Sequence, residues 1–119
     1  PKRFDVVVFP YPQNPSTYFI KLVIGLPGET VQIDSSGKIY INGQVLEENF
    51  GREVISNPGL AQEPIKLGED QYFVLGDNRN NSMDSRDSRV GLISGKSMVG
   101  KAFLRIWPLN KFGLVRHSM

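Results

Sequence analysis

Hydrophobic positions along the chain fall into short runs that are separated by turn-forming residues. The runs at residues 5–9, 18–26 and 71–76 are rich in β-branched and aromatic side chains and have the length of strands. No stretch of ten or more residues repeats with the 3.6-residue period of an amphipathic helix. The pattern therefore predicts an all-β chain, folded as a mainly antiparallel, strongly bent sheet or open barrel.

Turn signals in the middle of the chain predict a three-strand meander. A Ser-Ser-Gly turn separates residues 30–34 from residues 38–41, and Asn42-Gly43 leads into a third run at 44–48. Asn-Gly favours a two-residue hairpin because both residues tolerate positive φ angles.

Proline and glycine mark the predicted loops. The proline-rich stretch at residues 10–16 predicts a loop that ends the first strand. Residues 47–70 are also expected to form loops, because glycine and proline recur in them. The polar stretch at 77–89 follows a buried-type strand, and residues 98–108 predict the last strand.

Lys21 is the unusual residue of the second hydrophobic run. Side chains alternate between the two faces of a strand, so Lys21 shares a face with Phe19 and Val23, and the opposite face is apolar too. Such a lysine can extend its ammonium group to water, pair with an acid, or lose its proton. A neutral amine is a base, and it could take the proton from a serine hydroxyl.

The polar stretch at residues 77–89 combines acids, arginines, asparagines and serines. One interpretation is a solvated loop with Asx turns and weak ion pairs. The other is a network in which arginines bind carboxylates bidentately and hold Ser82 in place. A calcium loop is disfavoured by Arg79, by Arg86, and by the missing glycine and terminal glutamate of an EF-hand. We therefore expect no metal and no cofactor.

Composition narrows the possible functions. The 119 residues carry a formal net charge of +2 with both signs interspersed, which gives no case for nucleic-acid binding. Cysteine is absent and the one histidine is His117, so thiolate metal sites are excluded and a Ser-His-Asp triad is disfavoured. No apolar run reaches the roughly 20 residues of a transmembrane helix. Residues 103–115, with Trp107, are interpreted as core and rim, or alternatively as a membrane-facing patch.

Several blocks of the sequence together resemble type I signal peptidases, the membrane-bound Ser-Lys endopeptidases that remove signal peptides. The blocks are "PKRFDVVVF", "YFIKLVIGLPGE", "GDNRNNSMDSR" and "VGKAFLRIWP", in the order found in that family, and the resemblance runs from about residue 1 to residue 108. It implies one catalytic-type domain over residues 1–119, with a bent antiparallel β fold. It also implies a serine endopeptidase on the extracytoplasmic side of a bacterial plasma membrane, with signal peptides of preproteins as substrates and an anchor at the membrane surface.

The resemblance also implies roles for individual residues. Lys21 matches the general base, Ser82 matches the serine that orients this lysine, and Phe19 and Ile20 match residues that line pockets for small substrate side chains. Four charged residues match the ion-pair scaffold of the family's loop: Asp77, Arg79, Asp84 and Arg86.

Two departures from the family pattern stand out. Leu22 takes the place of an arginine that usually follows the lysine, which removes a possible ion pair to the loop. The family's nucleophile belongs to a Ser-Met-x-Pro motif upstream of the lysine block, and these 119 residues contain no such motif. We therefore expect the chain to begin after the anchor and the nucleophile, and to be inactive alone.

Two other functions remain open at this point. A signal-peptidase-like protein without catalysis could act as an assembly or binding factor for surface proteins. A Ser-Lys autoprotease of the self-cleaving repressor type is a further alternative, which the Gly-Asp-Asn-Arg loop and the lack of a helix-turn-helix pattern disfavour.

Overall fold

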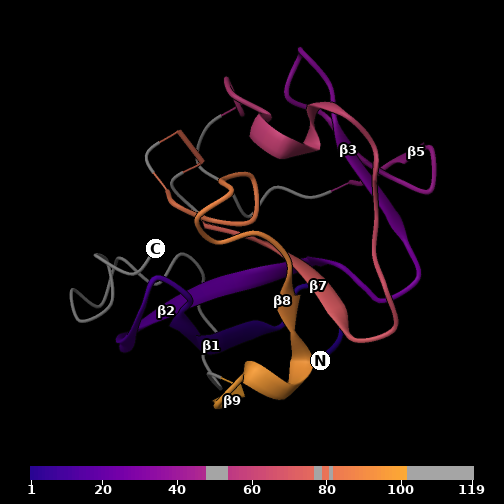
Figure 1. Ribbon diagram of the computed structural model, residues 1–119. Helices are drawn as coiled ribbons and strands as arrows, with labels where there is room; N and C mark the ends of the chain where they lie inside the picture. The colour runs from indigo at the N-terminus through magenta and orange to yellow at the C-terminus, as the bar shows by residue number, and fades with distance from the viewer. Residues whose placement is uncertain (48–53, 77–78, 81, 102–119) are drawn as a thin grey trace.

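The computed structural model describes residues 1–47, 54–76, 79–80 and 82–101, and within them it is built from β-strands (Figure 1). The strands are β1 (Val6–Tyr11), β2 (Asn14–Gly25), β3 (Thr30–Ile33), β4 (Ile39–Ile41), β5 (Gln44–Val45), β6 (Ile65–Lys66), β7 (Gln71–Leu75), β8 (Ile93–Ser94) and β9 (Gly100–Lys101). Two single-turn 3₁₀ helices accompany them, η1 (Gly59–Gln62) and η2 (Gly95–Ser97). In this part of the chain there is no α-helix, and no helix could span a membrane. The all-β prediction is confirmed.

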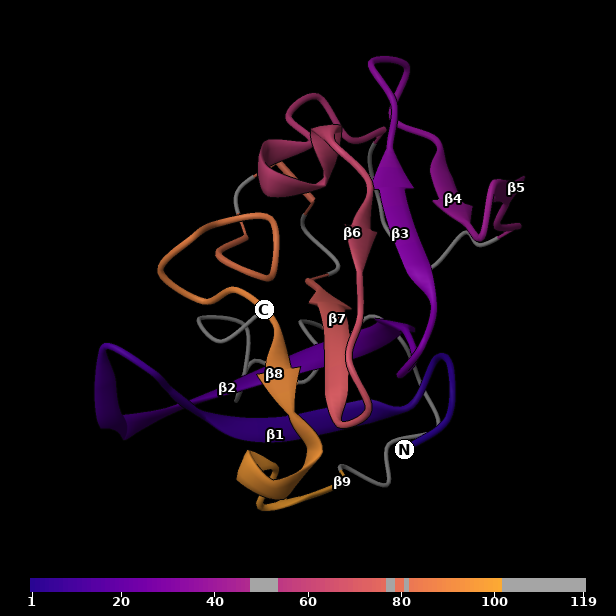
Figure 2. The same cartoon turned by 45° about the vertical axis from the view of Figure 1, so that its right-hand side comes forward.

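The strands form two antiparallel sheets. Sheet A has the order β8-β7-β2-β1-β9, and sheet B has the order β5-β4-β3-β6. In both views the long β1–β2 ribbon belongs to the lower sheet, sheet B stands above one end of it, and the hairpin tip points away from sheet B (Figures 1 and 2). The sheets therefore meet at an angle rather than as one flat layer, as the predicted bent sheet requires.

The predicted meander is confirmed as β3, β4 and β5. Val31 lies opposite Ile41, and Ile41 lies opposite Gln44. Asn42 and Gly43 both have positive φ angles, 52° and 83°, which is the requirement of the two-residue turn that their sequence predicts.

The prediction that the proline-rich stretch ends the first strand is wrong. β1 continues through Pro10, which lies opposite Tyr18, and β2 starts before Pro15. β9 pairs with β1 only at Val7 and Val8, so Pro10 lies where β1 has an open outer edge within the described chain. A sheet tolerates proline at such an edge, and the register shift next to Pro10 relaxes the pairing further.

Two short strands were not predicted. β6 lies in a stretch predicted to be loop, and β8 lies in a stretch for which the sequence indicated no strand. Each has two residues, which is too short for an alternating pattern to be recognised. Of the predicted strand at residues 98–108, β9 forms a part; residues 102–108 and the Trp107 patch lie outside the described residues.

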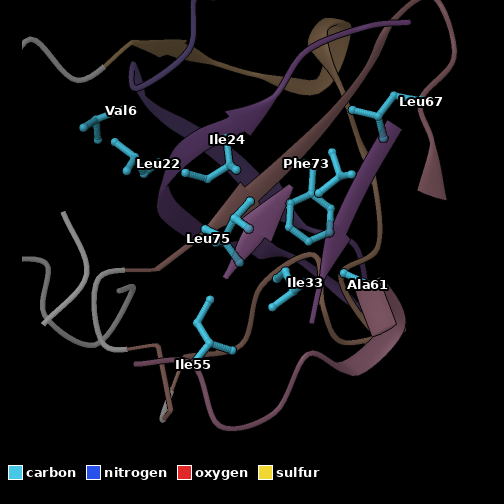
Figure 3. Close-up of a cluster of buried hydrophobic side chains, with 11 residues drawn as sticks. Val6, Leu22, Ile24, Ile33, Ile55, Ala61, Leu67, Phe73 and Leu75 are labelled. Atoms are coloured by element: carbon cyan, nitrogen blue, oxygen red, sulfur yellow. The ribbon is translucent and has the colours of Figure 1, made fainter. Parts of the chain in front are cut away.

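Two hydrophobic clusters occupy the opposite faces of β2. The first lies between the sheets and includes Leu22 and Ile24 of β2 (Figure 3). The second lies on the other face and includes Val23 together with Phe9. Both faces of β2 are thus buried, which explains why neither face of this strand is polar in the sequence. Each large apolar side chain buried in this way contributes about 1.5–3 kcal/mol to folding.

Candidate active site

Lys21 is buried in the middle of β2. Its residue is only 2% exposed, and it lies opposite Val7 of the neighbouring strand. The Lys21 Nζ donates a hydrogen bond of 3.0 Å to Ser82 Oγ, although the two residues are 61 positions apart in the chain. The interpretation in which the ammonium group reaches solvent is therefore wrong.

An aromatic ring lies beside the same amine, with two further rings packed behind it. Lys21 Nζ lies 5.1 Å from the ring centroid of Phe19. The Phe19 ring stacks on Tyr11, with centroids 4.7 Å apart, and meets Phe9 edge-on at 6.2 Å. These rings exclude water from one side of the nitrogen, so the amine has an apolar wall on that side and a hydroxyl group as a hydrogen-bond partner.

The loop that carries Ser82 contains a buried ion pair. Asp84 is 0% and Arg86 is 7% exposed. The Arg86 guanidinium donates to both carboxylate oxygens, at 2.8 and 2.9 Å, and the Gly76 N–H donates to the same carboxylate at 3.1 Å. Arg79, 2% exposed, donates from Nε to the Gly76 carbonyl at 2.6 Å. For these residues the network interpretation holds rather than the solvated loop, whereas Asp77 lies outside the described residues.

Ser85 attaches the loop to sheet A. Its N–H donates to the Val74 carbonyl at 3.1 Å, and its Oγ accepts from the Val74 N–H at 2.9 Å. Val74 lies opposite Val23, which is two residues from Lys21 on β2. The pairing of β2 with β7 and the hydrogen bonds from β7 to Ser85 therefore fix the position of the Ser82 loop relative to Lys21. Sequence reasoning did not single out Ser85, because nothing distinguishes it there from the other serines of the loop.

The segment that contains η1 covers the other side of the loop. The Leu60 N–H donates to the Arg86 carbonyl at 2.8 Å, and the Arg86 guanidinium donates to the Asn57 carbonyl at 3.3 Å. Figures 1 and 2 both place this segment beside the loop that follows β7. Between them is a polar hollow of about 130 Å³, lined by Asn57, Gly59, Arg79, Asn80, Ser82, Asp84, Arg86 and Asp87.

The two residues predicted to line substrate pockets lie on opposite faces of β2. Phe19 packs against the second cluster, on the face of Lys21, and Ile20 packs against the first. Leu22, which stands where the family usually has arginine, is 1% exposed and belongs to the first cluster. Of the predicted residues, the structure thus brings together Lys21, Ser82 and Phe19.

Comparisons with known proteins show which proteins this chain is similar to. Signal peptidase I of Leptolyngbya laminosa is 46% identical over 121 residues, which cover 95% of this chain and 56% of that protein. Signal peptidase I P of Bacillus subtilis subsp. natto is 37% identical, over 98% of this chain and 64% of that protein. The chain therefore spans less than two thirds of the length of these relatives.

A solved structure shares the fold. The crystal structure of a signal peptidase I from Enterococcus faecalis V583 matches with a TM-score of 0.68 and 34% identity, over 86% of this chain and 96% of that one. The family described as signal peptidase, peptidase S26, matches residues 1–107. With both sequence and fold in agreement, the chain belongs to the signal peptidase family S26.

Proposed function

We propose that the protein containing this chain is a serine endopeptidase that removes N-terminal signal peptides from exported preproteins. The observation that carries the proposal is the buried Lys21 amine, 3.0 Å from Ser82 Oγ. We expect the domain to act on the extracytoplasmic side of a bacterial plasma membrane, close to the membrane surface, where preproteins present their signal peptides.

Lys21 is the proposed general base. Burial disfavours the charged form of an amine and lowers the pKa of a fully buried lysine by up to about 3–5 units. The Phe19 ring acts in the other direction, since a cation–π contact favours the ammonium by about 2 kcal/mol or more at a desolvated site. The proposed role requires burial to be the larger effect, so we expect a pKa well below the free value of about 10.4.

The chemistry follows from that neutral amine. Ser82 holds the amine in one orientation, and Lys21 takes the proton from a nucleophilic serine as that serine attacks the scissile carbonyl. Lys21 then returns the proton to the leaving amine of the cleaved peptide. The 119 residues contain no Ser-Met-x-Pro sequence, where the family has its nucleophile, so we expect them to cleave no peptide by themselves.

The edge of β2 is the proposed binding site for the substrate. Among the described residues, β2 pairs with β7 from Leu22 to Gly25, and residues 18–21 pair with β1. An extended peptide could add its backbone to this part of β2 and bring its scissile bond to Lys21. Phe19 and Ile20 would then lie beside the small side chains that precede the cut.

Lys21→Arg in the intact protein tests the proposal. We expect cleavage of a preprotein to stop, because a guanidinium group with a pKa above about 12 does not give up its proton at working pH. Lys66→Arg is the matched control, since Lys66 is exposed and contacts only the Gly28 carbonyl among the described contacts. NMR titration of the Lys21 side chain should give a depressed pKa.

Two outcomes would count against the proposal. An ordinary lysine pKa, measured with the Ser82 loop intact, would show that Lys21 is not the general base. Binding of a signal peptide by the intact protein without cleavage would instead favour the non-catalytic assembly or binding factor.

A further inference from the structure

The loop that carries Ser82 is attached to sheet A and to a segment beside sheet B. Ser85 attaches it to β7 of sheet A, as described above. Asn80, two residues before Ser82, attaches it to residues 54–56, beside sheet B. Because Lys21 lies on sheet A, both sets of hydrogen bonds determine where Ser82 lies relative to Lys21.

The Asn80 side chain makes three hydrogen bonds to this second segment. Its Oδ1 accepts from the Ser56 N–H and from the Ser56 hydroxyl, both at 2.8 Å. Its Nδ2 donates to the Val54 carbonyl at 3.0 Å. The amide therefore binds the residues on both sides of Ile55 and uses its donor and its acceptor together.

Ile55 makes this segment a firm attachment point. Its side chain is 3% exposed and belongs to the first hydrophobic cluster, between the sheets (Figure 3). Its backbone also packs closely against the β3–β4 turn, where a Cβ added to Gly37 would lie 2.6 Å from the Ile55 carbonyl oxygen. Asn80 thus connects the Ser82 loop to the hydrophobic core, because it binds Val54 and Ser56 and the side chain of Ile55 between them is buried.

Packing alone does not hold Ser82 on this side. Ser82 and Asn80 both line the polar hollow of about 130 Å³ between the loop and the η1 segment. Where a loop borders a polar hollow, directional hydrogen bonds at its rim decide its position, because few van der Waals contacts oppose a shift.

From these contacts we infer that Asn80 is a positioning residue for the Lys21–Ser82 pair, acting through the loop and not on the substrate. This inference rests on the proposed function of that pair. Without the Asn80 amide, the loop loses its hydrogen bonds to residues 54–56 and keeps those made by Ser85, Asp84 and Arg86. The distance from Ser82 to Lys21 then varies, and proton transfer by Lys21 slows.

Asn80→Ala and Asn80→Asp, made in the intact protein, test the inference. Asn80 is exposed, so both variants should fold. We expect Asn80→Ala to lower kcat about tenfold with KM within about twofold of wild type, since a misplacement of about 1 Å can cost on the order of 10²-fold. The acid limb of the pH–rate profile should also shift. Asn80→Asp keeps the acceptor for Ser56 and should retain more activity than Asn80→Ala.

A matched control and a probe independent of catalysis complete the experiment. Asn42→Ala removes another exposed asparagine, whose Oδ1 accepts from the Thr30 N–H in a hairpin of sheet B, and it also places alanine at a φ of 52°, so it reports any effect of general destabilisation. It should leave kcat and the pH profile unchanged. The methyl NMR signal of Met83, next to Ser82, should move in Asn80→Ala and stay in place in Asn42→Ala.

The outcomes separate this inference from the proposed function. One outcome is that Asn80→Ala leaves kcat, the pH profile and the Met83 signal unchanged while Lys21→Ala is inactive. This would overturn the role of Asn80 and leave the proposed function intact. Full activity in Lys21→Ala would instead overturn the proposed function. Equal losses in Asn80→Ala and Asn42→Ala would show a general structural effect and would also overturn the inference.

Discussion

Buried charge distinguishes this site at the scale of single residues. Lys21, Asp84 and Arg86 are all less than a tenth exposed, yet each has a directional polar partner. The sequence pattern showed that Lys21 lies among apolar residues but not which group binds its amine, because alternation along a strand does not identify contacts with distant segments. That group is the Ser82 hydroxyl, 61 residues away.

Two Asp–Arg pairs with the same spacing provide a stability test. Asp84→Asn leaves the Arg86 guanidinium buried without a full counter-charge, so we expect a loss of about 3–5 kcal/mol in the free energy of unfolding. In the Asp87–Arg89 pair the side chains are 30% and 59% exposed. The hydrogen bond from Arg89 holds the pKa of Asp87 at about 2, but solvent screens the pair, so Asp87→Asn should cost far less. Urea unfolding at neutral pH measures both, and equal losses would contradict the assignment of Asp84 to the interior.

Short elements position the site at the next scale. β2 carries Lys21 on one face and core residues on the other, while η1 packs on the loop that holds Ser82. η1 approaches so closely that a Cβ on Gly59 would collide with the Arg86 carbonyl. Gly59 also has a φ of +58°, a conformation that favours glycine.

Gly59→Ala tests whether this close approach matters. Gly28→Ala is its control, because Gly28 has a φ of +83° but no atom within 4 Å of an added Cβ. Backbone strain alone should cost Gly28→Ala about 1–2 kcal/mol. Gly59→Ala should lose more, since η1 must also move away from Arg86, and the Met83 methyl NMR signal should change. Equal urea midpoints for the two variants would show that the contact contributes nothing.

At the scale of the whole molecule, the site combines a strand of sheet A with a loop that also contacts the segment beside sheet B. Sheet A supplies Lys21, and the Ser82 loop connects β7 to β8 across the segment that borders sheet B. A shift of residues 54–56 relative to sheet A should therefore change the geometry of the pair. Conditions that loosen the fold should affect the site as well.

Acid should destabilise the whole fold. The Ser36 hydroxyl, the Lys38 N–H and other donors hold the pKa of Asp34 at about 2, below its ordinary value of 3.8. Arg3 likewise lowers the pKa of Glu29 from 4.5. A carboxyl with a lowered pKa stabilises the fold fully above its unfolded pKa and loses that stabilisation as pH falls through its folded pKa. We therefore expect the urea midpoint to fall between about pH 5 and pH 2.

Asp34→Asn should show a smaller fall over the same pH range, because the variant has no carboxylate to protonate at this position. Glu47→Gln, which removes an exposed carboxylate, is the control and should follow the wild type. A wild-type fall that Asp34→Asn leaves unchanged would assign the acid sensitivity to other groups.

Much of the fold could be predicted because its strands are local patterns. The meander follows from Asn42-Gly43 and from alternation, and β2 and β7 follow from their apolar runs. β6 and β8 could not be predicted, because two-residue strands exist only through their partners. Pro10 was mispredicted for the same reason, since its tolerance depends on where the neighbouring strand β9 ends.

By itself, the sequence determined the all-β class, the two apolar faces of β2, and the identity of Lys21 and Ser82 as candidates, because residue type and spacing act locally along a strand or turn. Only the tertiary structure decided that Lys21 meets Ser82, that Asp84 and Arg86 are buried together, and that Ser85 and Asn80 attach the loop to β7 and to residues 54–56. Those contacts join segments that are distant along the chain, and only the packing of the two sheets brings them within hydrogen-bond range.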